Sequence, residues 1–276
     1  ISNGVGTDGA HHVNLPRSFK FDEEYDRGCM NITSITHPIV IDGNDWFIDA
    51  DGFSRIFYIT SDNVTFINIG FVNGNASGKY NTTFSNSTGS LDKDTYGVGG
   101  AIFWAGKYGT LINATVDSNY AVLGGGIYYN ATASDCRSYN VTYSDNYAVT
   151  NGGAIDCNAS NMEIINVTFS GNYADYGAAL CREINATFGH GSNNTFIDNY
   201  AKTAGAALAW LNASSISINE YFFYHNGAGY SGGAIYVGEG SLRCNILNCV
   251  FEDNYVNDET DGHGGAIEWY SEKGIV

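Results

Sequence analysis

Residues 169–174 read FSGNYA, and closely similar segments recur along most of the chain. The asparagines of these segments follow one another at intervals of 26 to 28 residues. The other copies are VDSNYA (116–121), YSDNYA (143–148), FIDNYA (196–201), FYHNGA (223–228) and FEDNYV (251–256). A second signature, GGAI or a close variant, alternates with them and ends at Ile102, Ile127, Ile155, Leu180, Leu208, Ile235 and Ile267. Two independent motifs with one period indicate a repeat architecture.

The repeat predicts strands. Within Ile165–Phe169 apolar and polar residues alternate, which is the period of a strand. Two short strand-like segments per repeat, separated by Gly and Asn turns, leave no stretch for a crossover helix. We therefore predict an all-β fold, a single-stranded right-handed parallel β-helix of about ten turns of roughly 27 residues. With a spacing of about 4.8 Å per turn, the rod would be roughly 45–50 Å long.

The organisation follows from where the repeat begins. Residues 1–34 lack it and are predicted to be an N-terminal cap segment, while residues 35–276 are predicted to form the β-helix. A Ser-, Thr-, Asn- and Gly-rich stretch at about 75–95 interrupts the period and predicts an exposed loop insertion. After the last GGAI copy only nine residues follow, without a cap, and they end at Ile275 and Val276.

Each column of the repeat has a predicted role. The aromatic residues of the FSGNYA column are expected to stack inside as the core. The tyrosines after the asparagines are expected to face outward as an aromatic ladder: Tyr120, Tyr147, Tyr173, Tyr200 and Tyr255. The asparagines are expected to form an internal amide ladder in which each side chain bonds the next turn: Asn119, Asn146, Asn172, Asn199, Asn226 and Asn254.

Glycosylation signals are frequent. Asn-x-Ser/Thr occurs thirteen times, at Asn31, Asn63, Asn75, Asn81, Asn86, Asn113, Asn130, Asn140, Asn158, Asn166, Asn185, Asn193 and Asn212. N-linked glycans are therefore expected, although several of these sequons belong to the repeat itself. Neighbouring turns lie too close for every site to carry a glycan, so we expect partial occupancy or a plain Asn/Thr ladder at Asn113, Asn140, Asn166 and Asn193. The irregular segments hold the better candidates: Asn75, Asn81, Asn86, Asn130 and Asn212.

The six cysteines form no CxxC pair, which argues against zinc. Disulfides would fit an oxidising compartment, and Cys157–Cys181 is the favoured bridge because the two lie at nearly matching points of successive repeats. Buried free thiols are the alternative.

The charge limits the partners. Twelve Lys and Arg against 29 Asp and Glu give a net charge of −17, which would repel nucleic acid and anionic membranes. No apolar run approaches 18 residues, so no membrane insertion is expected within this chain.

The alternation of GGAI with FxxNxA resembles the repeats of chlamydial polymorphic membrane proteins. It looks more like the large adhesin-like surface proteins of methanogenic archaea, in which the pattern seen here at Ile39–Gly74 commonly precedes such turns. The resemblance covers about residues 35–270. It implies an extracellular, often glycosylated β-helix on the cell surface or envelope, with adhesion to cell-surface or host glycans or proteins as its role. Typical members are far longer than this chain.

Two readings of the function follow. The first is a non-catalytic surface protein, either adhesin-like or a structural subunit that stacks head-to-tail on copies of itself into a filament or sheath, with Ile275 and Val276 at the joint. The second is a protein that binds or cleaves polysaccharides as a lyase or hydrolase, which needs paired carboxylates or Ca²⁺ carboxylates beside a basic residue. Its candidates are Asp145, Asp198 and Asp253, or Asp42, Asp45, Asp49 and Asp51 near Arg55. In the first set Gly171 and His225 occupy the intervening turns, and the second set is typical of turns. Catalysis is therefore not expected.

No cofactor or metal site is predicted. His11 and His12, with Asp8 nearby, are more typical of a solvated terminal segment than of a metal site. Weak Ca²⁺ binding to the acidic surface is possible, without a defined ligand set.

Overall fold

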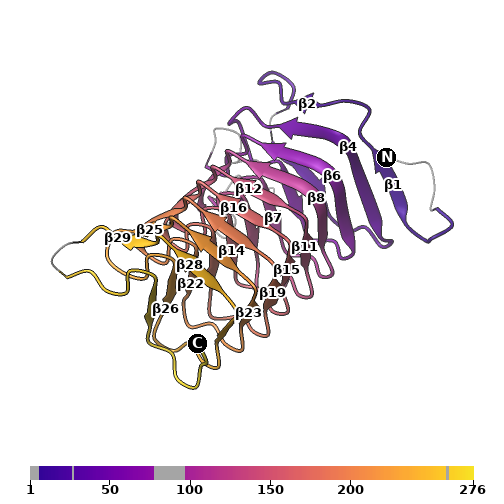
Figure 1. Ribbon diagram of the computed structural model, residues 1–276. Helices are drawn as coiled ribbons and strands as arrows, with labels where there is room; N and C mark the ends of the chain where they lie inside the picture. Colours follow the sequence, from indigo (N-terminus) through magenta and orange to yellow (C-terminus); the bar gives the residue numbers. More distant parts are fainter. Residues whose placement is uncertain (1–5, 27, 78–96, 259–260) are drawn as a thin grey trace, which may run out of the picture.

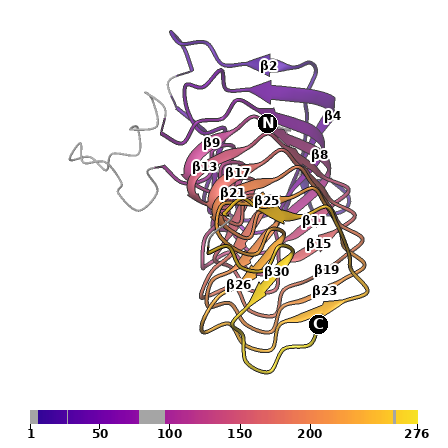
Figure 2. The same ribbon diagram turned by 60° about the vertical axis from the view of Figure 1, so that its left-hand side comes forward.

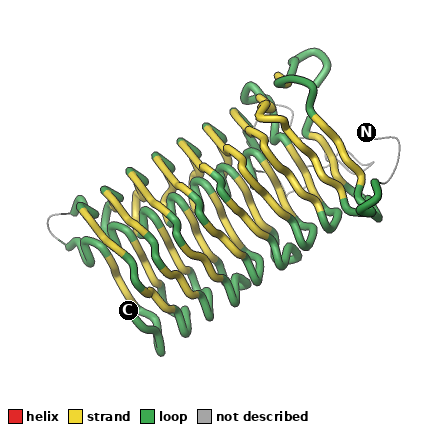
Figure 3. Tube along the Cα trace, turned by 45° about the vertical axis from the view of Figure 1, so that its right-hand side comes forward, coloured by secondary structure: helices red, strands yellow, loops and turns green. Residues whose placement is uncertain are grey.

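The computed structural model describes residues 6–26, 28–77, 97–258 and 261–276 as one rod of stacked strands (Figure 1). Within these residues every regular element is a strand, and strands pair in parallel from turn to turn (Figure 3). The chain therefore forms the all-β parallel solenoid that the repeat predicts. Of the loop insertion predicted at about 75–95, the structure describes residues 75–77, and the remaining residues lie outside the described part.

Three sheets make up the rod (Figure 2). Sheet A has 15 strands. It begins with β1 (His11–Asn14), β2 (Phe19–Lys20), β4 (Ile39–Asp49), β6 (Val64–Val72) and β8 (Thr110–Asp117). It continues as two columns, β11 (Arg137–Tyr139), β15 (Glu163–Ile165), β19 (His190–Ser192), β23 (Ser217–Asn219) and β27 (Asn245–Leu247), and β12 (Thr142–Ser144), β16 (Thr168–Ser170), β20 (Thr195–Ile197), β24 (Phe222–Tyr224) and β28 (Val250–Glu252).

Sheet B contains the GGAI strands and has nine members. They are β3 (Met30–Ile32), β5 (Phe57–Ile59), β7 (Ile102–Trp104), β10 (Ile127–Tyr129), β14 (Ile155–Cys157), β18 (Leu180–Arg182), β22 (Leu208–Trp210), β26 (Ile235–Val237) and β30 (Ile267–Trp269). Sheet C contains the tyrosine strands β9 (Tyr120–Leu123), β13 (Tyr147–Asn151), β17 (Tyr173–Tyr176), β21 (Tyr200–Ala204), β25 (Gly227–Ala228) and β29 (Tyr255–Val256). The nine strands of sheet B are separated by eight intervals, so the solenoid has about eight turns instead of the expected ten or so.

The N-terminal segment joins the solenoid directly. β1 pairs with β4 from His11 opposite Ile39, and β3 pairs with β5 from Met30 opposite Phe57. The strands β1, β2 and β3, which precede the sequence repeat, thus lie in register with the next turn at the end of the rod.

Two backbone devices shape every turn. A residue with positive φ, such as Asn166 at 55°, separates the two columns of sheet A, and asparagine tolerates this conformation better than most residues. The first glycine of the GGAI motif also has positive φ, as at Gly152 with 64°. The second position is glycine in five of the seven copies and alanine at Ala178 and Ala206, and at Gly125 a Cβ would lie 2.3 Å from the carbonyl oxygen of Gly153 in the next turn.

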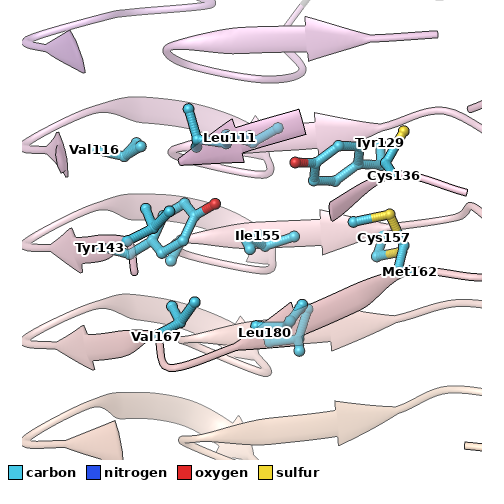
Figure 4. Packing of buried hydrophobic residues seen from close by; sticks show 14 of the residues in the cluster. Leu111, Val116, Tyr129, Cys136, Tyr143, Ile155, Cys157, Met162, Val167 and Leu180 are labelled. Carbon is cyan, nitrogen blue, oxygen red and sulfur yellow. The ribbon is translucent and has the colours of Figure 1, made fainter. Parts of the chain in front are cut away.

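The interior is built from the predicted aromatic column. Tyr143, Phe169, Phe196, Phe223 and Phe251 stack with centroid separations of 4.6–5.0 Å. Earlier in the rod Val116 takes the same place, directly above Tyr143 (Figure 4). Such stacking buries large apolar areas in identical layers, so each turn provides the packing surface for the next.

The internal amide ladder is present and runs in one direction. The side-chain Nδ2 of each ladder asparagine donates to Oδ1 of the asparagine in the following turn at 2.9–3.0 Å. The same Oδ1 also accepts the backbone N–H of the preceding asparagine. In the turn before Asn119, Gly74 stands in the ladder position, and its N–H donates to Asn119 Oδ1 at 2.7 Å.

Candidate functional site

The outward tyrosines form a stacked ladder on sheet C. Each tyrosine begins a strand just after a ladder asparagine, and parallel register places it over the tyrosine of the next turn. The ring centroids of Tyr120, Tyr147, Tyr173 and Tyr200 are separated by 5.3, 4.8 and 5.9 Å, with interplanar angles of 7–24°. Tyr120 and Tyr147 remain 38% and 39% exposed.

Stacking determines what this ladder can offer a ligand. The ring faces lie against one another, so the surface presents ring edges and a row of phenolic hydroxyls rather than free aromatic faces. The row ends before Tyr255, because the next turn carries Gly227. A Cβ on Gly227 would lie 2.3 Å from Cζ of Tyr255, so the Tyr255 ring covers the glycine. The ladder therefore comprises four tyrosines, with the fifth displaced.

A second row of side chains lies on the outer face of sheet B. We call it the sheet B outer column, and parallel register aligns its members, Tyr58, Phe103, Tyr128, Asp156, Cys181, Ala209, Tyr236 and Glu268. Strand alternation predicts solvent exposure for this row, yet Phe103, Tyr128, Asp156, Cys181 and Ala209 are buried. Val98, which precedes β7, and Leu123, the last residue of β9, pack against Phe103 and Tyr128.

Asp156 is the anomaly in this column. Its side chain is completely buried, and neither carboxylate oxygen has a hydrogen-bond partner. Burial, with a smaller contribution from the nearby charge of Glu183, raises the pKa of Asp156 well above its ordinary value. Burial and the same two acidic groups raise the pKa of Tyr128 to about 12. Asn151, at the end of β13, donates to Glu183 Oε1 at 3.0 Å and so links sheet C to the edge of this column.

The column opens into a pocket at its C-terminal end. Its volume is about 440 Å³, and its walls are Tyr230, Ser231, Tyr236, Glu239, Asp261, His263, Glu268 and Tyr270. Tyr236 and Tyr270 meet edge to face at 6.1 Å, and Tyr176 lies 6.3 Å from Tyr236 on the other side. Unlike the ladder, these rings do not form a parallel stack.

The pocket is electronegative. The Glu268 side chain is only 10% exposed, accepts a hydrogen bond from the Tyr270 hydroxyl at 2.6 Å and lies 3.5 Å from His263 Nδ1. Burial and the charge of Glu268 raise the pKa of Tyr236, and the hydrogen bond to Glu268 raises the pKa of Tyr270. The residues that line the pocket include no Lys or Arg.

This pocket was not predicted from the sequence. One feature of the sequence could have indicated it. Asp156, Tyr236 and Glu268 each follow the Ile or Leu of a GGAI motif, a position that strand alternation predicts to face outward.

The acidic candidates for catalysis are not brought together as pairs on adjacent turns. Asp145 lies over Gly171, where a Cβ would be 2.4 Å from its Oδ1, and Asp198 lies 2.7 Å from Nδ1 of His225. Asp253 occupies the equivalent position in the following turn, also with positive φ.

The second acidic set, Asp42, Asp45, Asp49 and Asp51, makes local contacts in and near turns. Asp42 accepts the N–H of Asn44 and Nδ2 of Asn68, Asp49 accepts the N–H of Asp51, and Asp51 pairs with Lys20 at 2.9 Å. Asp45 is exposed and has positive φ. Arg55 does not face this set, because it is fully buried and donates to the carbonyl oxygens of Val98 and Gly99.

The histidine candidates have local partners. His12 Nε2 lies 2.9 Å from Asp8, and the His11 ring contacts His37 edge to face at 5.6 Å. Among the described residues, no group of three or more His, Cys, Asp or Glu is placed to hold a metal ion.

Several sequons form a second ladder on the exterior. Nδ2 of Asn113, Asn140, Asn166 and Asn193 donates to Oδ1 of the asparagine in the preceding turn, beginning from Asn68. This nitrogen is the glycan attachment atom. Asn63 and Asn212 are exposed and have positive φ, Asn75 and Asn130 are half-buried, and Asn81 and Asn86 lie outside the described residues.

The expected Cys157–Cys181 bridge is not formed, and both residues are free thiols. Cys157 pairs with Arg182, and Cys181 pairs with Asp156. The one-residue offset directs Cys157 into the core and Cys181 to the opposite face of sheet B, so their Sγ atoms cannot meet. The same offset follows from the GGAI motif, since Cys157 lies two residues after Ile155 and Cys181 one residue after Leu180.

The two ends of the rod expose apolar side chains. At the N-terminal end an apolar pocket of about 610 Å³ includes Val13, Met30, Ile41 and Phe57. At the other end Ile275 bonds to the strand edge through Cys244 and Ile246, and Ile275 and Val276 are 60% and 74% exposed.

Comparison with known proteins shows a partial similarity to a curated protein. No protein-family model matches the chain, and no solved structure matches it. Over 179 residues, 64% of the chain, it is 31% identical to the metabotropic glutamate receptor-like protein R of Dictyostelium discoideum. The chain spans about 10% of that protein's length, so the similarity concerns a small part of it. No helix within the described residues is long and apolar enough to cross a membrane.

Proposed function

We propose that this chain is a non-catalytic, extracellular β-solenoid glycoprotein of the cell surface or envelope, adhesin-like in function, coiled in the right-handed sense usual for parallel connections. The observation that carries the proposal is the exposed tyrosine ladder on sheet C. Four stacked rings hold their hydroxyls in a row on a rigid sheet. Tyrosine is enriched in recognition surfaces because it combines apolar area with a polar tip at low entropic cost.

The ladder suits recognition of an extended partner. Its repeat along the rod equals the spacing of strands, about 4.8 Å, so several weak contacts can act together on a polymeric glycan or a surface protein. The exterior sequon column lies on sheet A, and of the predicted glycan sites Asn75 adjoins the ladder, at its Tyr120 end. A cell-surface glycan or protein is therefore the partner that we propose.

A binding assay tests this function. The purified chain, labelled with a fluorophore, would be applied to a glycan array and to intact cells. Tyr147→Phe with Tyr173→Phe keeps the stack but removes two hydroxyls, and we expect binding to weaken at least about fivefold. Tyr108→Phe, in an exposed turn between β7 and β8 and outside sheet C, is the matched control. Equal binding by all three proteins would refute the ladder as the adhesive surface.

A second function is supported by the ends of the rod. Each end combines apolar surface with the free edge of parallel strands, and another turn of the same three-sheet cross-section would match it best. We propose head-to-tail stacking into a filament or sheath as this alternative. Electron microscopy at physiological salt decides it, since filaments should form in the wild type and be lost in Val276→Asp with Ile275→Asp. Discrete short rods in the wild type would refute it.

A further inference from the structure

We propose that the pocket at the C-terminal end of the sheet B outer column binds an organic cation, an alkylammonium group that lies against the aromatic wall formed by Tyr236 and Tyr270 and is neutralised by Glu268. The proposal goes beyond the adhesive role of the tyrosine ladder, because it concerns a different sheet and a different ligand class.

The first argument for this ligand is the arrangement of the tyrosine rings that line the pocket. Tyr236 and Tyr270 are inclined to each other at 63°, with 6.1 Å between centroids, and exposed Tyr230 adds a further wall. An edge-to-face pair covers one face of one ring, so it leaves more of the electron-rich ring surface uncovered than the stacked ladder does. A cation within about 6 Å of such faces is attracted by the ring quadrupoles.

The second argument is the negative charge of the side chains that line the pocket. Glu239, Asp261 and Glu268 line it, and His263 is the nearest basic group, 3.5 Å from Glu268. Glu268 lies on β30, and its hydrogen bond from Tyr270 fixes the carboxylate and that ring together. A low exposure of 10% for its side chain strengthens its attraction for a positive charge because water screens it poorly.

Shape and charge together select the ligand class. An anion would meet three carboxylates, and a neutral sugar would gain no benefit from them. A volume of about 440 Å³ is within the range of small-molecule sites and exceeds that of a bare metal ion. An alkylammonium group, whether on a free amine, a lipid head group or a lysine side chain, satisfies both the rings and the carboxylates.

Ligand-observed NMR on the intact chain tests the proposal with choline and with its uncharged isostere, 3,3-dimethyl-1-butanol. We expect choline to bind at millimolar concentration and the isostere to bind about tenfold more weakly. Phosphocholine and an N-acetylated lysine amide distinguish a lipid head group from a protein side chain as the source. Equal binding of choline and its isostere, or no choline binding at 50 mM ligand, would overturn the proposal.

Variants locate the site. Glu268→Gln keeps the shape and removes the charge, and it should weaken choline binding by about fivefold or more. Tyr236→Leu should have a similar effect, whereas Tyr236→Phe keeps the ring and should bind within about twofold of wild type. Tyr108→Leu and the ladder variants should bind choline as the wild type does, so failure of this site and failure of the ladder are distinguishable. Unchanged binding in Glu268→Gln would contradict the assignment even if choline binds elsewhere.

Discussion

Asn146 Oδ1 accepts two hydrogen bonds from Asn119 of the preceding turn, one from its backbone N–H at 3.1 Å and one from Nδ2 at 2.9 Å. Both residues are buried, so no water replaces these partners. Each ladder asparagine thus completes the backbone bonding of its neighbour while its own amide is completed by the next. The ladder therefore couples the turns through polar contacts that a purely apolar core would not supply.

Replacement of one ladder residue should destabilise the whole rod. Asn172→Ala removes the acceptor of the Asn146 N–H and Nδ2 and the donor to Asn199 and Tyr143. Buried donors left without acceptors lose their hydrogen bonds without gaining water, and we expect the free energy of unfolding to fall by about 3 kcal/mol. Urea unfolding followed by circular dichroism measures it. Asn166→Gly, in the exterior ladder of the same repeat, keeps the positive φ and should lose less than about 1 kcal/mol. Equal losses in the two variants would show that burial of the ladder is unimportant.

The glycines of the GGAI motif offer a matched pair. A Cβ on Gly125 would lie 2.3 Å from the oxygen of Gly153, whereas one on Gly265, in the last copy, meets no atom closer than 4.0 Å. Gly125→Ala should therefore destabilise by about 1–3 kcal/mol through overpacking, and Gly265→Ala should be close to neutral. Thermal unfolding of the two variants compares them directly. A neutral Gly125→Ala would mean that the stacking distance of the turns adapts freely.

The repeat predicted the contacts that follow from its period. A residue about 27 positions away lies directly above in the next turn, so the ladder, the aromatic core and the outward tyrosines could be assigned from spacing alone. An average period does not assign contacts that depend on the length of one particular turn. Cys157 and Cys181 differ by one position in register, which alignment on Ile155 and Leu180 of the GGAI motif gives and the average period does not. The pocket around Tyr236 depends on His263, which follows the irregular segment after β29, and no period places that segment. The burial of Asp156 was missed because strand alternation assigns its face to solvent.

The buried carboxyl of Asp156 should make stability depend on pH. Burial raises its pKa in the folded state above about 3.9, its value in an unfolded chain. Its contribution to stability is therefore fully present below about pH 4 and is lost as the pH rises toward the folded-state pKa. Asp156→Asn keeps the shape without the ionisation. We expect the variant to gain stability over the wild type progressively as the pH rises from 4 to 7.

Urea midpoints at several pH values measure this gain, with Asp145→Asn, an exposed carboxyl, as the control. A constant difference between Asp156→Asn and wild type across this range would show that Asp156 does not bind the extra proton in the folded protein.

The buried cysteines should behave as inert thiols. Burial raises the pKa of Cys136 to about 12, and it also raises those of Cys157 and Cys181. Since the thiolate is the reactive form, iodoacetamide should label these residues only after unfolding. Peptide mapping without reductant should recover Cys157 and Cys181 unlinked. A Cys157–Cys181 cross-linked peptide from the native protein would contradict the register of β14 and β18.

Glycan occupancy should follow the exterior ladder. At Asn140 and Asn166 the attachment nitrogen is hydrogen-bonded to the preceding turn, and neighbouring sites are about 4.8 Å apart. Asn63 and Asn212 are exposed, and their side chains are not part of the exterior asparagine ladder. Glycopeptide mass spectrometry of the native material should therefore show higher occupancy at Asn63 and Asn212. Full occupancy at Asn140 and Asn166 together would contradict this expectation.

The direction of the interturn bonds has a mechanical consequence. The bonds of the internal ladder join residues 26 to 28 positions apart, and the strand pairing of all three sheets joins the same successive turns along the rod axis. A pulling force applied between the two ends acts along these bonds and is carried in series by every interturn interface, and the outermost turn should open first because it is bonded on one side only. The rod would lengthen in steps of about one repeat and could dissipate tension as a series of small extensions rather than by a single rupture.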